Sequence, residues 1–148
     1  MKMDDVIKLD NQLCFPLYVC SREIIKKYKP VLSKLDLTYT QYITMMVLWE
    51  KSICRVNELG KILYLDSGTL TPLLKKLETK GYIKRVRDKK DERNLNIVIT
   101  DKGTKLKSEA ILVPNEIKKC INLSDDEIII LYKLLYKLIN NMEGDVNG

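Results

Sequence analysis

The sequence contains no histidine, and it has one tryptophan and one phenylalanine among its 148 residues, although it has eight tyrosines. Because histidine is absent, a structural zinc site would need all four cysteines: Cys14, Cys20, Cys54 and Cys120. None of these pairs has Cys-x-x-Cys spacing, and their separations match no common zinc module. We therefore predict no metal and no cofactor, and the cysteines are either packing residues or reactive thiols.

Long apolar runs are also missing, since no stretch approaches the ~20 residues that a membrane span needs. The charged N-terminus, MKMDDVIKLDNQ, lacks the apolar core of a secretory signal. We expect a cytoplasmic protein, where a disulfide scaffold is disfavoured. With 45% hydrophobic and 31% charged residues, the chain is typical of one globular domain spanning residues 1–148.

Basic residues outnumber acidic ones, 26 to 20, which gives a formal net charge of +6. Many of them crowd between positions 75 and 93: Lys75, Lys76, Lys80, Lys84, Arg85, Arg87, Lys89, Lys90 and Arg93. A charge run usually forms a solvated face, but it can also bind a polyanion. The place of this cluster in the fold decides between the two.

The N-terminal segment has an apolar stripe at helical spacing: Leu9, Leu13, Leu17, Cys20 and Ile24. We predict an amphipathic helix there. Pro16 interrupts the stripe and predicts a kink, unless it lies in the first turn of the helix. Pro30 is predicted to close the segment or to open the next turn.

The middle of the chain predicts three helices and a hairpin. Thr38 to Gln41 reads as a capping box, a short helix follows from about 56 to 64, and SGTLTPLLKKLETKG predicts another helix capped by Asp66 or Ser67. Pro72 leaves its start open. The period then changes, and residues 82–86 and 95–99 predict two strands joined by the charged tip RDKKDERN.

Two helices are predicted after the hairpin. One opens at residues 100–103, with Pro114 interrupting or restarting it, and the other follows a second capping box at residues 124–127. A heptad-like seam runs along the last helix: Ile128, Leu131, Leu135, Leu138 and Met142. The seam indicates a dimer interface, although it could also cover the chain's own core.

These elements predict a mainly α fold with a small β-hairpin wing (α+β). We expect a winged helix-turn-helix core at about residues 36–103, flanked by dimerisation helices at about 5–35 and 104–143. A helix with a polar outer face fits a DNA major groove, and a basic hairpin tip reaches phosphates or the minor groove. The candidate DNA-binding residues are Ser67, Thr69, Thr71, Lys75 and Lys76 on the helix, with Arg85, Arg87, Lys89, Asp91 and Arg93 on the wing. A helix-hairpin that contacts other proteins is the alternative.

The stretch LDSGTLTPLLKKLE, followed by GYIKRVRDKKDERNLNIVITDKG, resembles the winged-helix core of the MarR family, and Asp91-Glu92-Arg93 matches the family's wing-tip motif. The N-terminal stretch LDNQLCFPLYVCSREIIKKYKP, then LTYTQY, resembles the OhrR/SarZ-like organic hydroperoxide-sensing branch. This resemblance implies a homodimer that binds a pseudo-palindromic operator on double-stranded DNA, usually to repress transcription.

The same resemblance implies that Cys14 is the redox-sensing thiol. A sensing cysteine must react as a thiolate, and without histidine its stabilisation must come from Lys or Arg, a helix N-terminus or neutral donors. The resemblance assigns that role to Tyr28 and Tyr39, partly from the other subunit, with Tyr18 nearby. It also makes Cys120 a candidate resolving thiol. Cys20 and Cys54 are predicted packing residues.

The sequence therefore predicts a repressor released from DNA when organic hydroperoxide oxidises Cys14, and not an enzyme. Within the family, the alternatives are release by a phenolic ligand between the helices, or a broader thiol-redox regulator of virulence and stress genes. From other classes, a thiol peroxidase or a helical interaction module without DNA specificity would fit.

Overall fold

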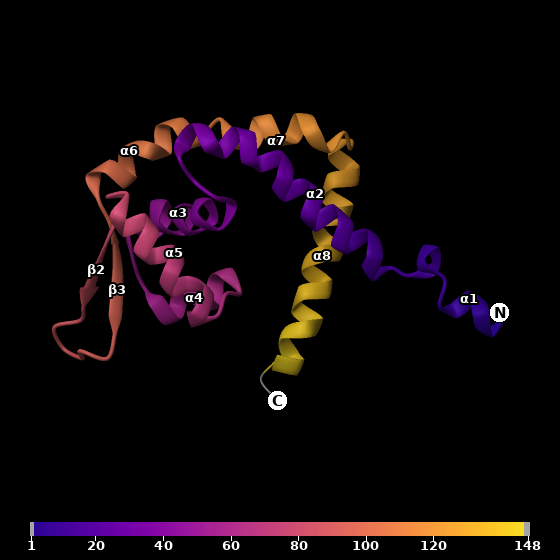
Figure 1. Cartoon of the computed structure of the whole chain (residues 1–148), viewed down its shortest axis with the longest axis horizontal. Coiled ribbons are helices and arrows are strands. Elements are labelled where there is room, and N and C mark those ends of the chain that lie inside the picture. The colour runs from indigo at the N-terminus through magenta and orange to yellow at the C-terminus, as the bar shows by residue number, and fades with distance from the viewer. Residues whose placement is uncertain (1, 147–148) are drawn as a thin grey trace. The chain divides into compact units, whose positions relative to one another are not determined.

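The computed structural model describes residues 2–146, and Figure 1 shows the elements in chain order. The elements are α1 (Met3–Val6), the 3-10 helix η1 (Leu9–Asn11), α2 (Cys14–Leu32), the 3-10 helix η2 (Ser33–Leu35), α3 (Tyr39–Lys51), β1 (Ile53–Arg55), α4 (Val56–Leu63), α5 (Ser67–Thr79), β2 (Ile83–Arg87), β3 (Leu95–Ile99), α6 (Asp101–Ala110), α7 (Val113–Ile121) and α8 (Asp125–Val146). The chain divides into two compact units, residues 1–116 and 117–148, which are described separately.

Helix α3 begins with the predicted capping box. Thr38 Oγ1 accepts from the backbone N–H of Gln41 at 3.4 Å, and Gln41 Oε1 accepts from the backbone N–H of Thr38 at 3.1 Å. Reciprocal bonds of this kind satisfy two donors that a helix start would otherwise leave unpaired. Behind the box, α3 buries Thr44, Met45 and Leu48 completely, so it forms the centre of the core.

Helices α4 and α5 form the helix-turn-helix. Tyr64 ends α4 in the left-handed conformation, with φ of 54°, and Asp66 Oδ1 caps α5 by accepting from the backbone N–H of Thr69 at 2.8 Å. Helix α5 therefore starts at Ser67, and Pro72 lies inside it. The turn leaves no room for a side chain at residue 60, since a Cβ on Gly60 would lie 2.9 Å from the carbonyl oxygen of Leu65. The leucine stripe of α5 is buried: Leu70, Leu73, Leu74 and Leu77.

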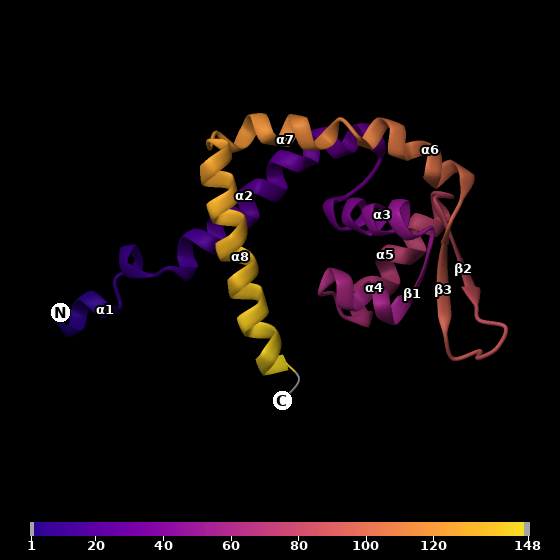
Figure 2. The same cartoon turned by 180° about the vertical axis from the view of Figure 1, so that it is seen from behind.

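The sheet has three antiparallel strands in the order β1-β3-β2. The hairpin register pairs Ile83 with Ile99 and Arg87 with Leu95, so β2 starts one residue later than predicted. Strand β1, which pairs Cys54 with Ile97, was not predicted. It has only three residues, too few for an alternating pattern to show. Figure 2 shows the hairpin extending beyond α4 and α5, as a wing does.

Helix α2 corrects two predictions about the N-terminal segment and decides a third, the effect of Pro16. It begins at Cys14, so Leu9 of the predicted stripe lies in η1 instead. Pro16 falls in the first turn, where its missing N–H has no helical carbonyl to bond and no kink is required. Pro30 does not close the helix, because α2 continues through it to Leu32.

The second unit consists of the end of α7 and all of α8. Pro114 stands second in α7, so the chain restarts a helix there, as one of the two predictions allowed. Ser124 and Glu127 form the predicted capping box, with the Ser124 N–H donating to Glu127 Oε2 at 2.8 Å and the Glu127 N–H to Ser124 Oγ at 3.2 Å. Among residues 2–146, no helix is long and apolar enough to cross a membrane.

Candidate DNA interface and thiol site

Helix α5 separates a buried apolar face from an exposed polar one. The polar side chains predicted for DNA contact are all exposed in the chain: Ser67, Thr69, Thr71, Lys75 and Lys76. Its leucines point into the core, which fixes the helix against α3 and α4. The hydroxyl and ammonium groups are therefore presented together on one side of a rigid helix, as base and phosphate recognition requires.

The tip of the wing places a cation in solvent and orients it. Arg93 is 93% exposed, and its backbone N–H and Nε both donate to Asp91 Oδ1, at 3.1 and 3.3 Å. Arg87 Nη1 donates to the carbonyl oxygen of Glu92 at 2.9 Å, which braces the tip from the strand. Lys89 is exposed beside them. The wing therefore presents the basic groups that the sequence predicted, with Asp91 orienting Arg93.

Arg85 has a different environment from the other basic residues of the wing. Its Nε and Nη2 donate to Glu78 Oε1 at 3.0 and 2.9 Å, and its backbone N–H donates to Glu78 Oε2 at 2.9 Å. These bonds hold the pKa of Glu78 below its usual value. The Arg85 guanidinium therefore fastens strand β2 to the recognition helix α5, where Glu78 lies.

A second ion pair braces the base of the wing. Arg55 Nη2 lies 3.6 Å from Asp88 Oδ2, which joins β1 to the residue after β2. This pair could not be predicted, because β1 itself was not predicted.

Cys14 is the first residue of α2 and is exposed in the chain. The N-cap position before it is Leu13, an apolar residue that cannot cap the helix with its side chain. Tyr18 lies one turn further on the same face, and the Arg22 guanidinium carbon lies 5.3 Å from the centre of the Tyr18 ring. Arg22 was not identified from the sequence. Its spacing, four residues after Tyr18 and eight after Cys14, could have placed it on the same face of the helix.

The two other predicted tyrosines lie together. The ring centres of Tyr28 and Tyr39 are 4.8 Å apart, and Tyr42 follows at 6.0 Å from Tyr28. Burial raises the pKa of all three tyrosines above the ordinary value of 10.0, and neighbouring phenols add to the effect at Tyr28 and Tyr42. At neutral pH the hydroxyls therefore stay protonated and can donate hydrogen bonds.

The structure does not bring Cys14 to this pair within one chain. Cys14 and Tyr28 are fourteen residues apart on the same continuous helix. At 1.5 Å of rise per residue, they are separated by about 21 Å along its axis. Only Tyr18 is near Cys14 in the same subunit.

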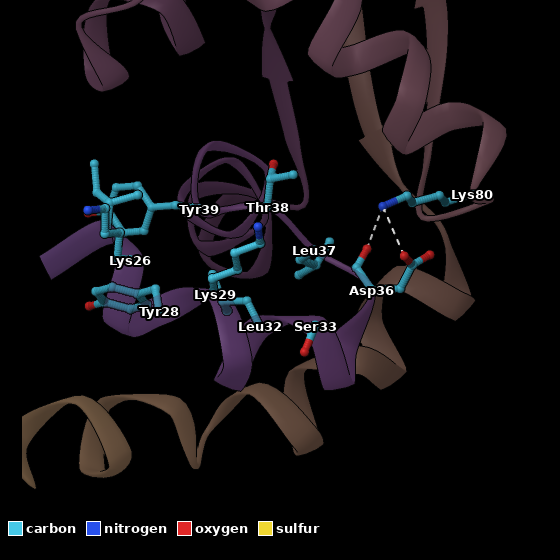
Figure 3. Close-up of a pocket in the computed structure, with 11 residues that line it drawn as sticks. Lys26, Tyr28, Lys29, Leu32, Ser33, Asp36, Leu37, Thr38, Tyr39 and Lys80 are labelled. Atoms are coloured by element: carbon cyan, nitrogen blue, oxygen red, sulfur yellow. Dashed lines mark hydrogen bonds and ion pairs between the residues drawn. The ribbon is translucent and has the colours of Figure 1, made fainter. Parts of the chain in front are cut away.

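Figure 3 shows a pocket beside the tyrosine pair, with a volume of about 440 Å³. It is lined by Ile25, Lys26, Tyr28, Lys29, Leu32, Ser33, Asp36, Leu37, Thr38, Tyr39 and Lys80. The Tyr28 and Tyr39 rings lie at one end and the Lys80 ammonium at the other. The pocket therefore has phenol rings at one end and, at the other, an ammonium paired with the Asp36 carboxylate.

The remaining cysteines differ in environment. Cys54 is buried, and desolvation raises the pKa of its thiol to about 11, so the predicted packing role fits. Cys20 is exposed, so the prediction that it packs in the core is wrong for the single chain. Cys120 is exposed on α7, in the unit of residues 117–148. No group of three or more metal-ligating side chains occurs in the part of the chain that the structure describes.

Comparison with known proteins gives consistent matches. Residues 26–110 match the family described as the transcriptional regulators SarA and Rot. The chain is 45% identical to an organic hydroperoxide resistance transcriptional regulator of Bacillus subtilis, over 93% of this chain and 94% of the relative. It is 48% identical to the HTH-type transcriptional regulator SarZ of Staphylococcus aureus, over 94% and 89% respectively. The structure of reduced AbfR bound to DNA, a protein of Staphylococcus epidermidis, aligns with a TM-score of 0.77 at 36% identity, covering 96% of this chain and 99% of the other.

Proposed function

The chain belongs to the SarA/Rot type of MarR-family transcriptional regulators, and from this premise we propose that it is a homodimeric repressor that leaves its operator when organic hydroperoxide oxidises Cys14. The regulator prediction is confirmed over the peroxidase, because the matched relatives are regulators of transcription. One observation carries the redox half of the proposal: α2 begins with an exposed thiol, while near its other end it holds Tyr28 against Tyr39, the first residue of α3.

DNA recognition uses α5 and the wing. Thr69 and Thr71 contact base edges in the major groove, and Lys75 with Lys76 binds adjacent phosphates. Arg93 reaches the minor groove or its phosphates from the wing tip, since it is exposed and oriented by Asp91. Arg85 positions the wing through Glu78. A chain that acts on an operator in this way works in the cytoplasm.

Dimerisation is supported by apolar side chains that the single chain leaves exposed. The seam of α8 is exposed at Leu131, Leu135, Leu138 and Met142, and α2 exposes Phe15, Ile24 and Ile25. Large exposed apolar patches are rare on monomers, so each of these helix faces supports an interface. A two-fold dimer then presents two copies of α5 to half-sites about 34–36 Å apart, or a multiple of it.

The dimer also completes the thiol site. Because about 21 Å of helix separates Cys14 from Tyr28 in one chain, the hydroxyls that bind the sulfur come from Tyr28 and Tyr39 of the partner subunit. Tyr18 of the same chain is the third donor, one turn away. The start of α2 adds the positive end of a helix dipole, which favours an anionic sulfur.

The oxidation is a two-electron step. The Cys14 thiolate attacks the distal oxygen of the hydroperoxide, the O–O bond breaks, and an alkoxide leaves and takes a proton to become the alcohol. Sulfur becomes a sulfenic acid, which then condenses with a thiol to form a disulfide and water. The sulfenic oxygen and the disulfide no longer fit the tyrosine donors, so the relative placement of the two winged units changes and the operator is released.

The proposal is tested by measuring operator binding in a gel shift with reduced protein, then with cumene hydroperoxide, then with hydrogen peroxide. Cys14→Ser protein should bind the operator when reduced and stay bound after treatment. Cys20→Ser is the matched control, since Cys20 is also an exposed thiol on α2. Release of the Cys14→Ser dimer by cumene hydroperoxide would overturn the redox mechanism.

The resolving thiol is tested separately. We propose Cys120 for this role, because its thiol is exposed on α7. Cys120→Ser protein should form the sulfenic acid but no inter-subunit disulfide on a non-reducing gel. If that variant releases DNA with wild-type kinetics and no added thiol, the resolving role is refuted and the sensing role of Cys14 stands.

The pocket beside the tyrosine pair favours a second candidate trigger. Its volume of about 440 Å³ suits a small aromatic ligand, and Lys26, Lys29 and Lys80 could bind an acidic group. Salicylate, a phenolic carboxylate, is a simple probe. Release of operator DNA from fully reduced protein on salicylate addition would support ligand control, and no release up to millimolar ligand would exclude it for this class.

A further inference from the structure

Lys80 joins two regions of the DNA-binding unit that are far apart in sequence. It follows the last residue of α5, and its ammonium donates to the carbonyl oxygen of Asp36 and, at 3.1 Å, to Gln41 Oε1. It also lies 3.5 Å from Asp36 Oδ1. Figure 3 shows this ammonium reaching Asp36 across one end of the pocket. A single side chain thus binds three oxygens on the segment that leads into α3.

One of these oxygens, Gln41 Oε1, belongs to the first turn of the helix that carries Tyr39. Gln41 Oε1 also accepts from the Thr38 N–H, so Lys80 shares the acceptor that completes the capping box of α3. Gln41 is 3% exposed, which prevents water from replacing these partners. Tyr39 is the first residue of α3, between the two halves of the box. A displacement of Tyr39 therefore changes the position of an oxygen that holds Lys80.

The main chain from Lys80 to Tyr82, which joins α5 to the wing, is held by the start of α6. Lys102 Nζ donates to the carbonyl oxygen of Lys80 at 2.7 Å, and Thr100 Oγ1 donates to that of Gly81 at 2.6 Å. The Thr100 N–H donates to the next carbonyl, that of Tyr82, at 3.0 Å. Three successive carbonyls are thus fixed where α5 ends and strand β2 begins. Movement of this junction moves α5 and the wing together.

We propose that Lys80 is the positioning residue that couples the tyrosine pair to the recognition helix and wing. In the reduced dimer, Tyr28 and Tyr39 are held by the thiolate, the α3 cap is intact, and Lys80 fixes the α5–β2 junction. Oxidation of Cys14 displaces Tyr39, and the capping box of α3 shifts. The α5–β2 junction then loses the side-chain link to Asp36 and Gln41 that Lys80 provides. This inference rests on the proposed function, since it specifies how the signal at Cys14 reaches DNA.

The test compares operator Kd in the reduced and the hydroperoxide-oxidised state for wild type and Lys80→Met, which keeps an apolar stem but removes the donor. The matched control is Lys34→Met, at an exposed lysine of η2 two residues before Asp36. Wild type and the control should show the same oxidised-to-reduced Kd ratio, within the ~5–150-fold typical of allosteric coupling. In Lys80→Met the ratio should fall toward one.

Two further readouts separate coupling from other roles of Lys80. A merely structural role would weaken both redox states equally and leave the Kd ratio unchanged, which would overturn the proposal. A direct phosphate contact would lower the slope of log Kd against log salt by about one, whereas a lysine engaged by Asp36 and Gln41 should leave it unchanged.

Reciprocity gives an independent measurement. If oxidation weakens DNA binding by some factor, bound DNA must disfavour oxidation of Cys14 by the same factor at equilibrium. Titration of the Cys14–glutathione mixed disulfide in glutathione redox buffers, with and without operator, should show this shift in wild type and not in Lys80→Met. An equal shift in both proteins would refute the coupling.

Asp36→Asn serves if Lys80→Met does not fold. Asparagine tolerates the left-handed backbone of residue 36, whose φ is 53°, and retains the carbonyl that Lys80 binds while removing the charge. It should reduce the Kd ratio partly. If the oxidised-to-reduced Kd ratio of the wild-type protein is one, the proposed function is wrong and the coupling with it. A normal wild-type ratio that both variants keep overturns the coupling alone.

Discussion

The two ends of α2 differ in exposure and in chemistry. Its first turn is uncapped by a side chain and carries Cys14 in solvent, with the exposed ring of Tyr18 one turn further on. Its last turns place Tyr28 against Tyr39 in a half-buried aromatic cluster beside the α3 cap. The first end has the thiol with one phenol, that of Tyr18, a turn away, and the other end has the Tyr28–Tyr39 pair without a thiol.

Under the proposed function, this contrast calls for a second subunit. A thiol with a single phenol nearby gains little over a thiol in water, and a tyrosine pair alone has nothing to activate. Since about 21 Å of helix keeps them apart, packing within the chain cannot bring them together. A two-fold axis can place the thiol end of one α2 beside the tyrosine end of the other, and this happens twice per dimer.

The strongest test of this contrast uses mixed dimers. One chain carries Cys14→Ser with intact tyrosines, and the other carries Tyr28→Phe and Tyr39→Phe with an intact thiol. We expect both homodimers to be poorly reactive. In the mixed dimer, the intact Cys14 faces intact tyrosines across the interface, so its sulfenic acid formation should return to about the wild-type rate. Mass spectrometry after dimedone trapping measures this on the Cys14 peptide.

Subunit exchange itself must be shown, by native mass spectrometry of chains that differ in mass. A mixture of two Cys14→Ser proteins is the unreactive control. If Cys14 remains slow in verified mixed dimers, thiol and tyrosines do not meet across the interface, and the split-site mechanism is wrong.

The next effect separates the two phenols from the rest of their cluster. Tyr28→Phe or Tyr39→Phe should each slow the reaction of Cys14 with cumene hydroperoxide about tenfold or more, because a hydrogen bond to a charged group contributes about 1.5–3 kcal/mol. The rate is followed by loss of reactive thiol under pseudo-first-order conditions.

Tyr42→Phe is the matched control for these two variants, since its ring lies in the same cluster but is 4% exposed. It should react at nearly the wild-type rate. Equal slowing by all three variants would mean that the cluster acts through packing rather than through hydroxyl donation.

Much of the fold was predictable because its signals are local. The capping boxes at Thr38 and Ser124, the leucine stripe of α5 and the strand at residues 95–99 each have signals within a few residues, and all were confirmed. Strand β1 was missed because its three residues form a strand only through pairing with β3, some forty residues later. The same reason hid the Arg55–Asp88 pair.

The sequence could suggest which residues form the thiol site, but not how far apart they lie. The motif resemblance named Cys14, Tyr18, Tyr28 and Tyr39, and these assignments stay predictions. What a linear pattern could not supply is the distance between them, which depends on α2 being one unbroken helix. The helix also continues past Pro30, where a stop was expected. One proline two residues from a helix end removes a single backbone hydrogen bond, which the packing of Leu32 in the core can offset.

A smaller effect is expected at alkaline pH at the tyrosine end of α2, and Tyr82, whose pKa burial also raises, acts in the same direction. The pKa values of Tyr28, Tyr39 and Tyr42 are raised by burial above 10.0, while the unfolded chain ionises near that value. Their contribution to stability is therefore complete below about pH 10 and is lost as pH rises beyond it. Urea unfolding at several pH values between about 8 and 11 should show the decline.

Tyr39→Phe tests whether these tyrosines cause the loss of stability at high pH. It removes one of the ionising groups, so the free energy of unfolding should fall less steeply with pH. Spectrophotometric titration provides the second check, with a late-ionising class of phenols in the folded protein that disappears in urea. A single tyrosine class in the folded state would contradict it.

The smallest effect is expected from the proline at the thiol end. Pro16→Ala restores an N–H in the first turn of α2, where no helical carbonyl can accept it, so the free energy of unfolding should change by about 1 kcal/mol or less. Pro30→Ala should leave the chain more stable than Pro16→Ala does, because its restored N–H can donate to the carbonyl of Lys26 inside the helix. Urea unfolding of both variants measures the difference. If Pro16→Ala instead changed stability by several kcal/mol, the proline would be fixing the path of the chain into α2, and the thiol end would be as tightly specified as the tyrosine end.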